Sequence, residues 1–262
     1  MNETDLQSIR KTRWLGKSIH FFDRIDSTNA KAKELAENGA KHGTLVVADS
    51  QSAGRGRLGR TWESQEGTGI FMTLILKPEV AMDRASMITL VTALAVAHGI
   101  KEVTGADVKI KWPNDIVLHG KKICGILTEM IVQPDNENYL VVGIGINVHN
   151  KSFPKELVSI ASSLHLEGYE VHRVSLIEKM MEHFEVFYEK FLQTEDLSPM
   201  LDGYQELLVN KDKAVRVLDF KEPFDGTAKG ITKRGELIVD TGEGTKLVSS
   251  GEVSVRGIYG YV

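Results

Sequence analysis

The stretch GRGRLGR, residues 54–60, places three arginines and three glycines in seven positions. Its glycines Gly54, Gly56 and Gly59 match the G-x-G-x-x-G spacing of a dinucleotide-binding turn. That turn joins a strand to a helix, whose N-terminus meets the pyrophosphate of the ligand. Here the residues that follow, TWESQEGTGIFMTLILK at 61–77, predict an irregular segment and then a second strand. The context therefore argues against a Rossmann domain.

The charge of the chain argues against a nucleic-acid patch. Lys and Arg total 32 against 36 Asp and Glu, so the formal net charge is −4. Proteins that bind nucleic acid through its phosphates usually carry a basic excess. A glycine- and arginine-rich loop in an acidic chain instead fits a small anionic ligand. The glycines allow close backbone approach, and guanidinium groups pair with carboxylate or phosphate oxygens.

Composition also limits the compartment and the chemistry. Cys124 is the single cysteine and stands in an apolar run, which predicts a small buried side chain and excludes an internal disulfide or a cysteine-rich zinc site. The N-terminus MNETDLQSIRKTRW lacks the apolar core of a signal peptide, and we expect no segment of about 18 apolar residues that could span a membrane. The sequence predicts a cytoplasmic protein without a membrane partner.

Hydrophobic periodicity predicts an α/β (α+β) fold. Helices are expected at 27–39, at 83–99 with Gly99 as its end, and at 175–194 with an apolar core stripe. Strands are expected at 43–49, 70–77, 108–112, 116–132 (a hairpin turning at 119–121) and 139–148. Trp112 alternates with Val108 and Ile110 onto one face of its strand, which predicts core packing.

The chain changes character from Ala214 onward. Five short strands, at 214–218, 226–231, 236–240, 246–250 and 252–259, are separated by glycines and charges. This pattern favours a small β-barrel. We therefore expect two domains, residues 1–210 and residues 211–262.

Five motifs stand in the order found in biotin protein ligases, and the chain resembles that family from about residue 20 onward. They are STN (27–29), DSQSAGRGRLGRTWES (49–64), KWPND (111–115), GKKICGIL (120–127) and GIGINV (143–148). The tail GEVSVR (251–256) matches the family's C-terminal domain. The resemblance implies a mixed β-sheet flanked by helices, related to lipoate ligases and class II aminoacyl-tRNA synthetases, plus a C-terminal SH3-like β-barrel.

The resemblance also implies a two-step reaction. Biotin's carboxylate attacks the α-phosphate of ATP, which carries Mg²⁺, and biotinyl-5′-AMP and pyrophosphate form. A lysine of the biotin carboxyl carrier protein of a carboxylase then displaces AMP. The first step brings two anions together, so positioned cations matter more than a nucleophilic side chain. The motifs supply such cations: Arg55, Arg57, Arg60, Lys111 and Lys122.

By the same resemblance, particular residues are expected to contact each substrate. The biotin-binding set is Ser27, Thr28, Asn29, Gln51, Gly54, Arg55, Gly56, Arg57, Lys122 and Gly125. The ATP-binding set is Arg57, Arg60, Trp62, Lys111, Asn114, Asp115 and Asn147. Lys122 and Arg57 are the expected catalytic residues, because both would lie against the reacting carboxylate and phosphate. Two roles stay open: Trp62 packs either in the core or on the adenine, and Asp115 places either Mg²⁺ or the incoming lysine.

Two alternative functions remain at this point. Lipoate or octanoate ligases share the fold and the reaction type, but the complete Arg/Gly loop and KWPND favour biotin. Some biotin ligases are also DNA-binding repressors with an N-terminal helix-turn-helix domain. Only 26 residues precede Ser27, too few for such a domain. We expect a monofunctional ligase that binds no specific DNA, with a homodimer left open.

Overall fold

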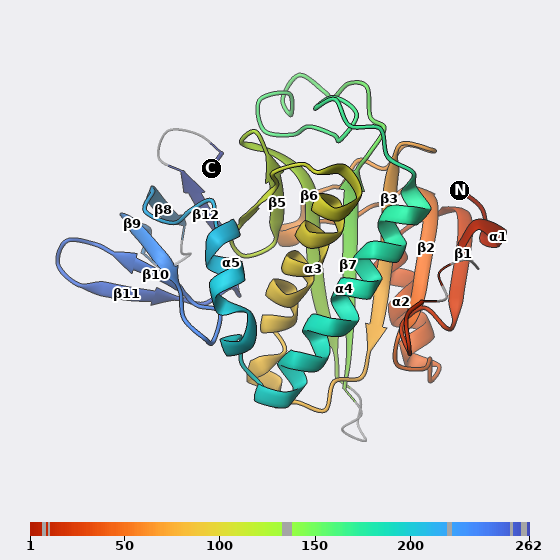
Figure 1. Cartoon of the computed structure of the whole chain (residues 1–262), viewed down its shortest axis with the longest axis horizontal. Coiled ribbons are helices and arrows are strands. Elements are labelled where there is room, and N and C mark those ends of the chain that lie inside the picture. Colours follow the sequence, from red (N-terminus) through yellow and green to blue (C-terminus); the bar gives the residue numbers. More distant parts are fainter. Residues whose placement is uncertain (7–8, 10, 133–137, 219–221, 252–253, 258–260) are drawn as a thin grey trace.

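The computed structural model describes residues 1–6, 9, 11–132, 138–218, 222–251, 254–257 and 261–262. The expected last strand (252–259) therefore lies partly outside the described residues. A seven-stranded mixed sheet runs in the order β1-β2-β3-β7-β6-β5-β4 (Figure 1). Its strands are β1 (Ile19–Ile25), β2 (Thr44–Gln51), β3 (Gly69–Leu76), β4 (Lys109–Lys111), β5 (Asp115–Leu118), β6 (Lys121–Ile131) and β7 (Tyr139–Asn147). Among the described strands of this sheet, β1 and β2 pair in parallel and the other neighbours pair antiparallel, so the expected mixed sheet is confirmed.

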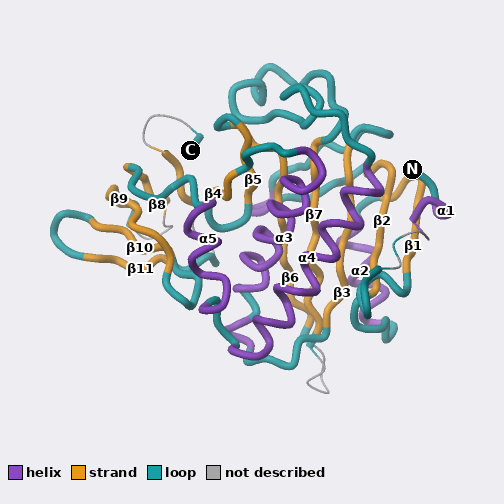
Figure 2. Tube along the Cα trace, in the orientation of Figure 1, coloured by secondary structure: helices purple, strands orange, loops and turns teal. Residues whose placement is uncertain are grey.

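Helices cover both faces of this sheet. The helices α3 (Met87–Thr104) and α4 (Arg173–Thr194) pack together on one face, and α2 (Thr28–Glu37) packs on the other (Figure 2). Shorter helical turns are α1 (Glu3–Leu6), η1 (Arg57–Gly59), η2 (Met82–Arg84), η3 (Ser198–Met200) and α5 (Leu201–Leu207). The N-cap of α2 is Ser27, whose side chain accepts from the Ala30 N–H.

The predicted end of α3 at Gly99 is wrong. The helix continues to Thr104, and Gly105 ends it with φ +73°. Gly99 instead allows close packing against α4, because an added Cβ would lie 2.6 Å from Met180 Cγ. By length and composition α3 could cross a membrane, contrary to our expectation that no segment could. Two thirds of its residues, however, are buried inside the protein, which is typical of a core helix.

The side chains of β7 point alternately into the core and to the opposite face of the sheet. Val142, Ile144 and Ile146 belong to the large apolar cluster under α3 and α4. Gly143 and Gly145 lie between them in sequence and therefore face the other side. Tyr139 and Val141 on this same side pack against α2, whereas the two glycines carry no side chain and leave room above the sheet.

A second, antiparallel sheet follows. Its five strands, in the order β11-β10-β9-β8-β12, are β8 (Ala214–Leu218), β9 (Phe224–Ile231), β10 (Leu237–Asp240), β11 (Thr245–Val248) and β12 (Ser254–Gly257). The expected β-rich C-terminal part is thus present, with β11 and β12 at the edges of the described pairing. Trp112 is buried, as expected, and its Nε1 donates to the Gly235 carbonyl at 2.9 Å. This bond fixes the small sheet against the end of β4.

Candidate active site

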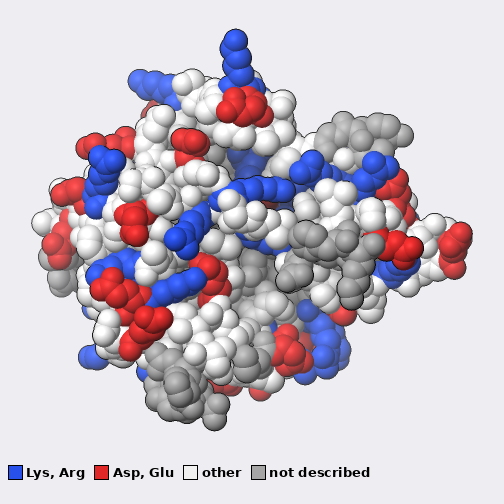
Figure 3. All heavy atoms as spheres, turned by 180° about the vertical axis from the view of Figure 1, so that it is seen from behind, with Lys and Arg blue, Asp and Glu red and all other residues white. Residues whose placement is uncertain are grey.

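Two cavities meet on the sheet face opposite α3 and α4. The larger, about 490 Å³, lies between the loop at 56–63, the β4–β5 junction, the loop at 153–161 and the C-terminal sheet. The smaller, about 40 Å³, lies over β6 and β7. The two share Gly56, Arg57, Trp62, Asn114 and Lys122. Ligands in the two cavities would therefore meet across this shared wall. Figure 3 shows Lys and Arg side chains gathered across this face.

Glycines form the floor of the smaller cavity. Gly125 in β6 pairs with Gly145 in β7. The Trp62 indole lies directly on both: an added Cβ would lie 2.6 Å from Trp62 Cε2 at Gly145 and 2.9 Å from Trp62 Cζ3 at Gly125. Trp62 Nε1 is buried without a hydrogen-bond partner among the described residues. In this conformation Trp62 fills the space beside Gly125, a residue that the family resemblance assigned to biotin binding.

Hydrogen-bonded polar side chains surround this floor. The Thr28 backbone N–H donates to Gln51 Oε1 at 2.8 Å. Asn29 Nδ2 donates to Glu129 Oε2 at 2.9 Å, and Asn29 Oδ1 accepts from the Thr73 hydroxyl at 2.7 Å. Each amide is held in one orientation by its partners, so this rim presents fixed donors and acceptors to a ligand.

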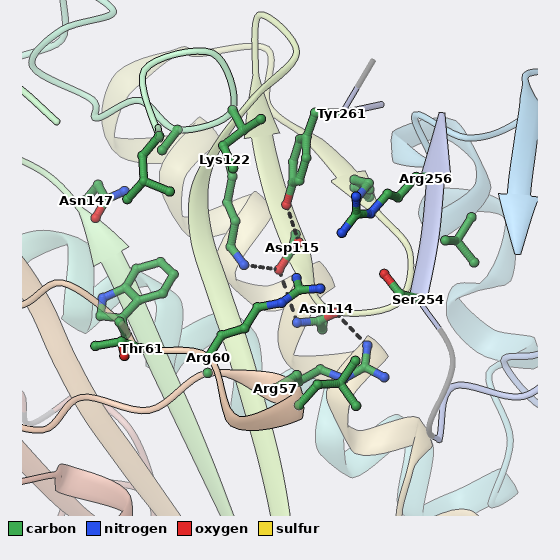
Figure 4. A pocket seen from close by; sticks show the side chains of 18 of the residues that line it. Arg57, Arg60, Thr61, Asn114, Asp115, Lys122, Asn147, Ser254, Arg256 and Tyr261 are labelled. Carbon is green, nitrogen blue, oxygen red and sulfur yellow. Dashed lines mark hydrogen bonds and ion pairs between the residues drawn. The ribbon is translucent and has the colours of Figure 1, made fainter. Parts of the chain in front are cut away.

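Two cations lie at the shared wall, and the KWPND motif orients both. Lys122 Nζ lies 2.6 Å from Asp115 Oδ1. Arg57 Nη1 donates to Asn114 Oδ1 at 2.9 Å, while its Nη2 donates to the Gly251 carbonyl at 2.7 Å. Figure 4 shows these side chains converging. Both predicted catalytic residues thus lie where the two cavities join.

The charges of this cluster depend on one another. Burial alone would raise the pKa of Asp115, but Lys122, Lys111 and a hydrogen bond from Tyr261 outweigh it, so the pKa is lowered and the carboxyl is ionised at neutral pH. Burial lowers the pKa of Lys111 to about 8, against the opposing effect of Asp115. Lys111 therefore loses its charge as the pH rises through the mildly alkaline range.

Two groups of residues lining the larger cavity were not predicted. The first is an apolar wall of Phe153, Leu157 and Ile160 from the loop between β7 and α4. This loop is joined to β6, since the Lys122 N–H donates to the Ile160 carbonyl at 2.8 Å. The apolar residues in the loop that follows GIGINV could have indicated this wall from the sequence. Such a surface suits the flat face of a base.

The second unpredicted group comes from the C-terminal sheet and the segment after it: Ser254, Arg256 and Tyr261. Ser254 and Arg256 belong to the GEVSVR stretch that matched the family's C-terminal domain, but the sequence analysis assigned them no role at the site, because they reach the cavity only through tertiary packing. Glu129, beside the smaller cavity, was also missed. It stands four residues after Gly125 on the same face of β6, so strand alternation could have identified it.

The structure brings the predicted residues together in two groups. Every residue of the predicted ATP set lines the larger cavity, and the predicted biotin set lines the smaller one except for Gly54. Gly54 instead packs against the later part of its own loop, since an added Cβ would lie 2.5 Å from the Trp62 carbonyl oxygen. Cys124 is fully buried, as expected, and burial raises the pKa of its thiol. It therefore has no nucleophilic role.

Family models match both parts of the chain. Residues 21–147 match the biotin/lipoate A/B protein ligase family, and residues 212–256 match the biotin protein ligase C-terminal domain. The first match spans the strands that carry the predicted motifs. The second spans the C-terminal sheet that closes the larger cavity.

Individual relatives agree with these matches. The bifunctional ligase/repressor BirA of Bacillus subtilis is 38% identical over 258 residues, which are 97% of this chain and 79% of that protein. The biotin–[acetyl-CoA-carboxylase] ligase of Mycobacterium tuberculosis is 31% identical over 235 residues, 87% of this chain and 85% of that protein. The solved structure of a biotin protein ligase from Aquifex aeolicus in complex with biotin and ATP has a TM-score of 0.82 at 30% identity, covering 92% of this chain and 99% of that one. The chain therefore belongs to the biotin protein ligase family.

Proposed function

We propose that this chain attaches biotin to a lysine of a carrier protein in two steps. Biotin's carboxylate oxygen attacks the α-phosphorus of ATP, pyrophosphate leaves, and biotinyl-5′-AMP forms. The lysine amine then attacks the biotinyl carbonyl carbon, and AMP leaves. One observation carries the proposal: two adjacent cavities share a wall that holds Arg57 and Lys122. A relative named for acetyl-CoA carboxylase supports a biotin carboxyl carrier protein as the acceptor.

The cations at the wall address the main barrier of the first step, the repulsion between two anions. Two unit charges about 4 Å apart interact by about 4 kcal/mol at an effective dielectric constant of about 20. Lys122 is oriented by Asp115, and Arg57 by Asn114. Because these groups are held in position in advance, little reorganisation is needed when charge develops in the transition state.

Binding of biotin requires the Trp62 ring to leave the glycine floor. A cavity of about 40 Å³ is far below the roughly 300–1,000 Å³ of ligand pockets. The loop that carries Trp62 has few apolar anchors, and Leu58 within it is 50% exposed. We propose that the loop opens for biotin and then closes over the adenylate, which excludes water from a mixed anhydride. The indole also lines the larger cavity, so a shift of the ring toward that cavity would clear the floor.

Mg²⁺ would enter with ATP and neutralise phosphate charge. The larger cavity offers two carboxylates, Asp115 and Glu63. Both oxygens of Asp115 already have partners, and the described residues contain no cluster of three or more potential metal ligands. This donor set fits an ion held mainly by the triphosphate.

The proposed reaction is tested by biotin-dependent exchange of labelled pyrophosphate into ATP. We expect exchange with biotin and none with lipoate or octanoate. An alkyl chain offers no hydrogen-bonding partner to the polar rim that contains Asn29 and Gln51, whereas biotin does. Labelling of a carrier domain on one lysine should follow. Exchange with lipoate and none with biotin would reject the proposal.

We also propose that these 262 residues act as a ligase alone. The relative from Bacillus subtilis is named a ligase/repressor, and this chain spans 79% of it. Among the described residues before Ser27, the helix is α1, which has four residues. Recognition of a specific DNA sequence by a helix-turn-helix domain requires a longer helix that enters the major groove. We expect weak, salt-sensitive DNA binding without sequence preference. A sequence-specific shift at nanomolar protein and physiological salt, strengthened by biotin and ATP, would refute this.

A further inference from the structure

We propose that Tyr261 is a positioning residue for adenylation, which acts through Asp115 on Lys122. The inference rests on the proposed function and adds to it a residue that lies outside every motif used to recognise the family. It gives Tyr261, which follows the C-terminal sheet in the chain, a function in the site.

Asp115 shares its two oxygens between different partners. The Tyr261 hydroxyl donates to Oδ2 at 2.5 Å. The other oxygen, Oδ1, lies 2.6 Å from Lys122 Nζ and accepts from Asn114 Nδ2 at 3.1 Å (Figure 4). Tyr261 therefore takes up an acceptor position on Oδ2, while Lys122 is held on Oδ1.

Tyr261 is packed into the cavity. Lys111 Nζ lies 3.8 Å from the centroid of the tyrosine ring. The neighbouring Val262 lies beside the β5–β6 turn, since a Cβ added to Gly120 would be 3.6 Å from Val262 Cγ2. Burial, together with the adjacent Asp115, raises the pKa of the phenol. The hydroxyl therefore keeps its proton and remains a donor.

The physical consequence concerns the freedom of the lysine. An ionised carboxylate accepts hydrogen bonds at both oxygens, and charge-assisted bonds are the strong ones. Without the phenol, Oδ2 would be open to the ammonium groups of Lys122 and Lys111. A lysine drawn onto both oxygens would point its charge at Asp115 and away from the reacting substrate oxygens. Tyr261 prevents this while leaving Lys122 aligned.

The first test compares two tyrosine-to-phenylalanine variants. Tyr261→Phe keeps the ring over Lys111 but removes the donor to Asp115. We expect kcat for biotin-dependent pyrophosphate exchange to fall about tenfold, the size expected for one hydrogen bond to a charged group. The KM for biotin should stay within about twofold of wild type. Tyr204→Phe is the matched control, because that buried hydroxyl in α5 has no partner among the described residues and Tyr204 lines neither cavity.

A double-mutant cycle distinguishes positioning from simple packing. If Tyr261 acts through Asp115, then Tyr261→Phe should cause no further loss of kcat in an Asp115→Asn background. A packing role would lower kcat equally in both backgrounds. Additive losses, or a Tyr261→Phe chain with the kcat of wild type, would overturn the inference. A wild-type chain without biotin-dependent exchange would instead refute the proposed function.

Discussion

The two cavities of the site are built in different ways. The smaller rests on paired strands, and its floor is shaped by the absence of side chains at Gly125 and Gly145. The larger is walled by loops and by the C-terminal sheet, with contacts such as Tyr261 to Asp115 that span 146 positions. Paired strands hold a floor rigidly, whereas loops can adapt to a ligand. Selectivity for biotin should therefore depend on the first region, and nucleotide binding on the second.

A substitution in the shared wall should have the largest effect on the exchange rate, since this wall lines both cavities. Lys122→Ala removes a charge directed at the reacting oxygens, and we expect the exchange rate to fall by about 10²–10³. Lys121→Ala is the control, because Lys121 is not among the described residues that line either cavity. Equal losses at both lysines would mean that the charge of Lys122 is not specifically aimed at the junction.

A substitution in the glycine floor should affect the binding of biotin more than the binding of ATP. Gly125→Ala would place a Cβ 2.9 Å from the Trp62 ring and 3.0 Å from Lys122 Nζ. One misplaced methyl group in a binding pocket costs roughly 10–200-fold, so we expect the KM for biotin to rise at least about tenfold. The KM for ATP should change little. Gly203→Ala, in α5 with open space around it, is the control. A parallel rise in both KM values would show that the two cavities are not independent.

The smallest predicted effect is a pH dependence confined to the nucleotide side. Lys111 has a pKa of about 8, so it is charged below that pH and loses its proton as the pH rises. Because the charged form attracts phosphates, kcat/KM for ATP should fall by about tenfold from its plateau by about pH 9. Lys111→Arg stays protonated and should remove this alkaline limb. If the limb persists in that variant, another group is responsible.

Much of the fold followed from local patterns. Alternation in VKIKW placed Trp112 in the core, and the apolar stripe of 175–194 predicted α4, because burial of one face is a local requirement. The error at Gly99 has the opposite cause. A glycine near a helical run reads as a stop, but here Met180 of a distant helix requires the small residue. Local sequence does not reveal such a partner.

Sequence alone determined the family motifs, and their order placed nearly all of the predicted site residues on the two cavities. Motifs are visible because each one is a continuous stretch whose residue types match its chemistry. Only the tertiary structure decided that Trp62 lies on the glycine floor and that Tyr261 reaches Asp115. Both contacts join segments far apart in the chain. They depend on packing between distant elements, which no local period or spacing encodes.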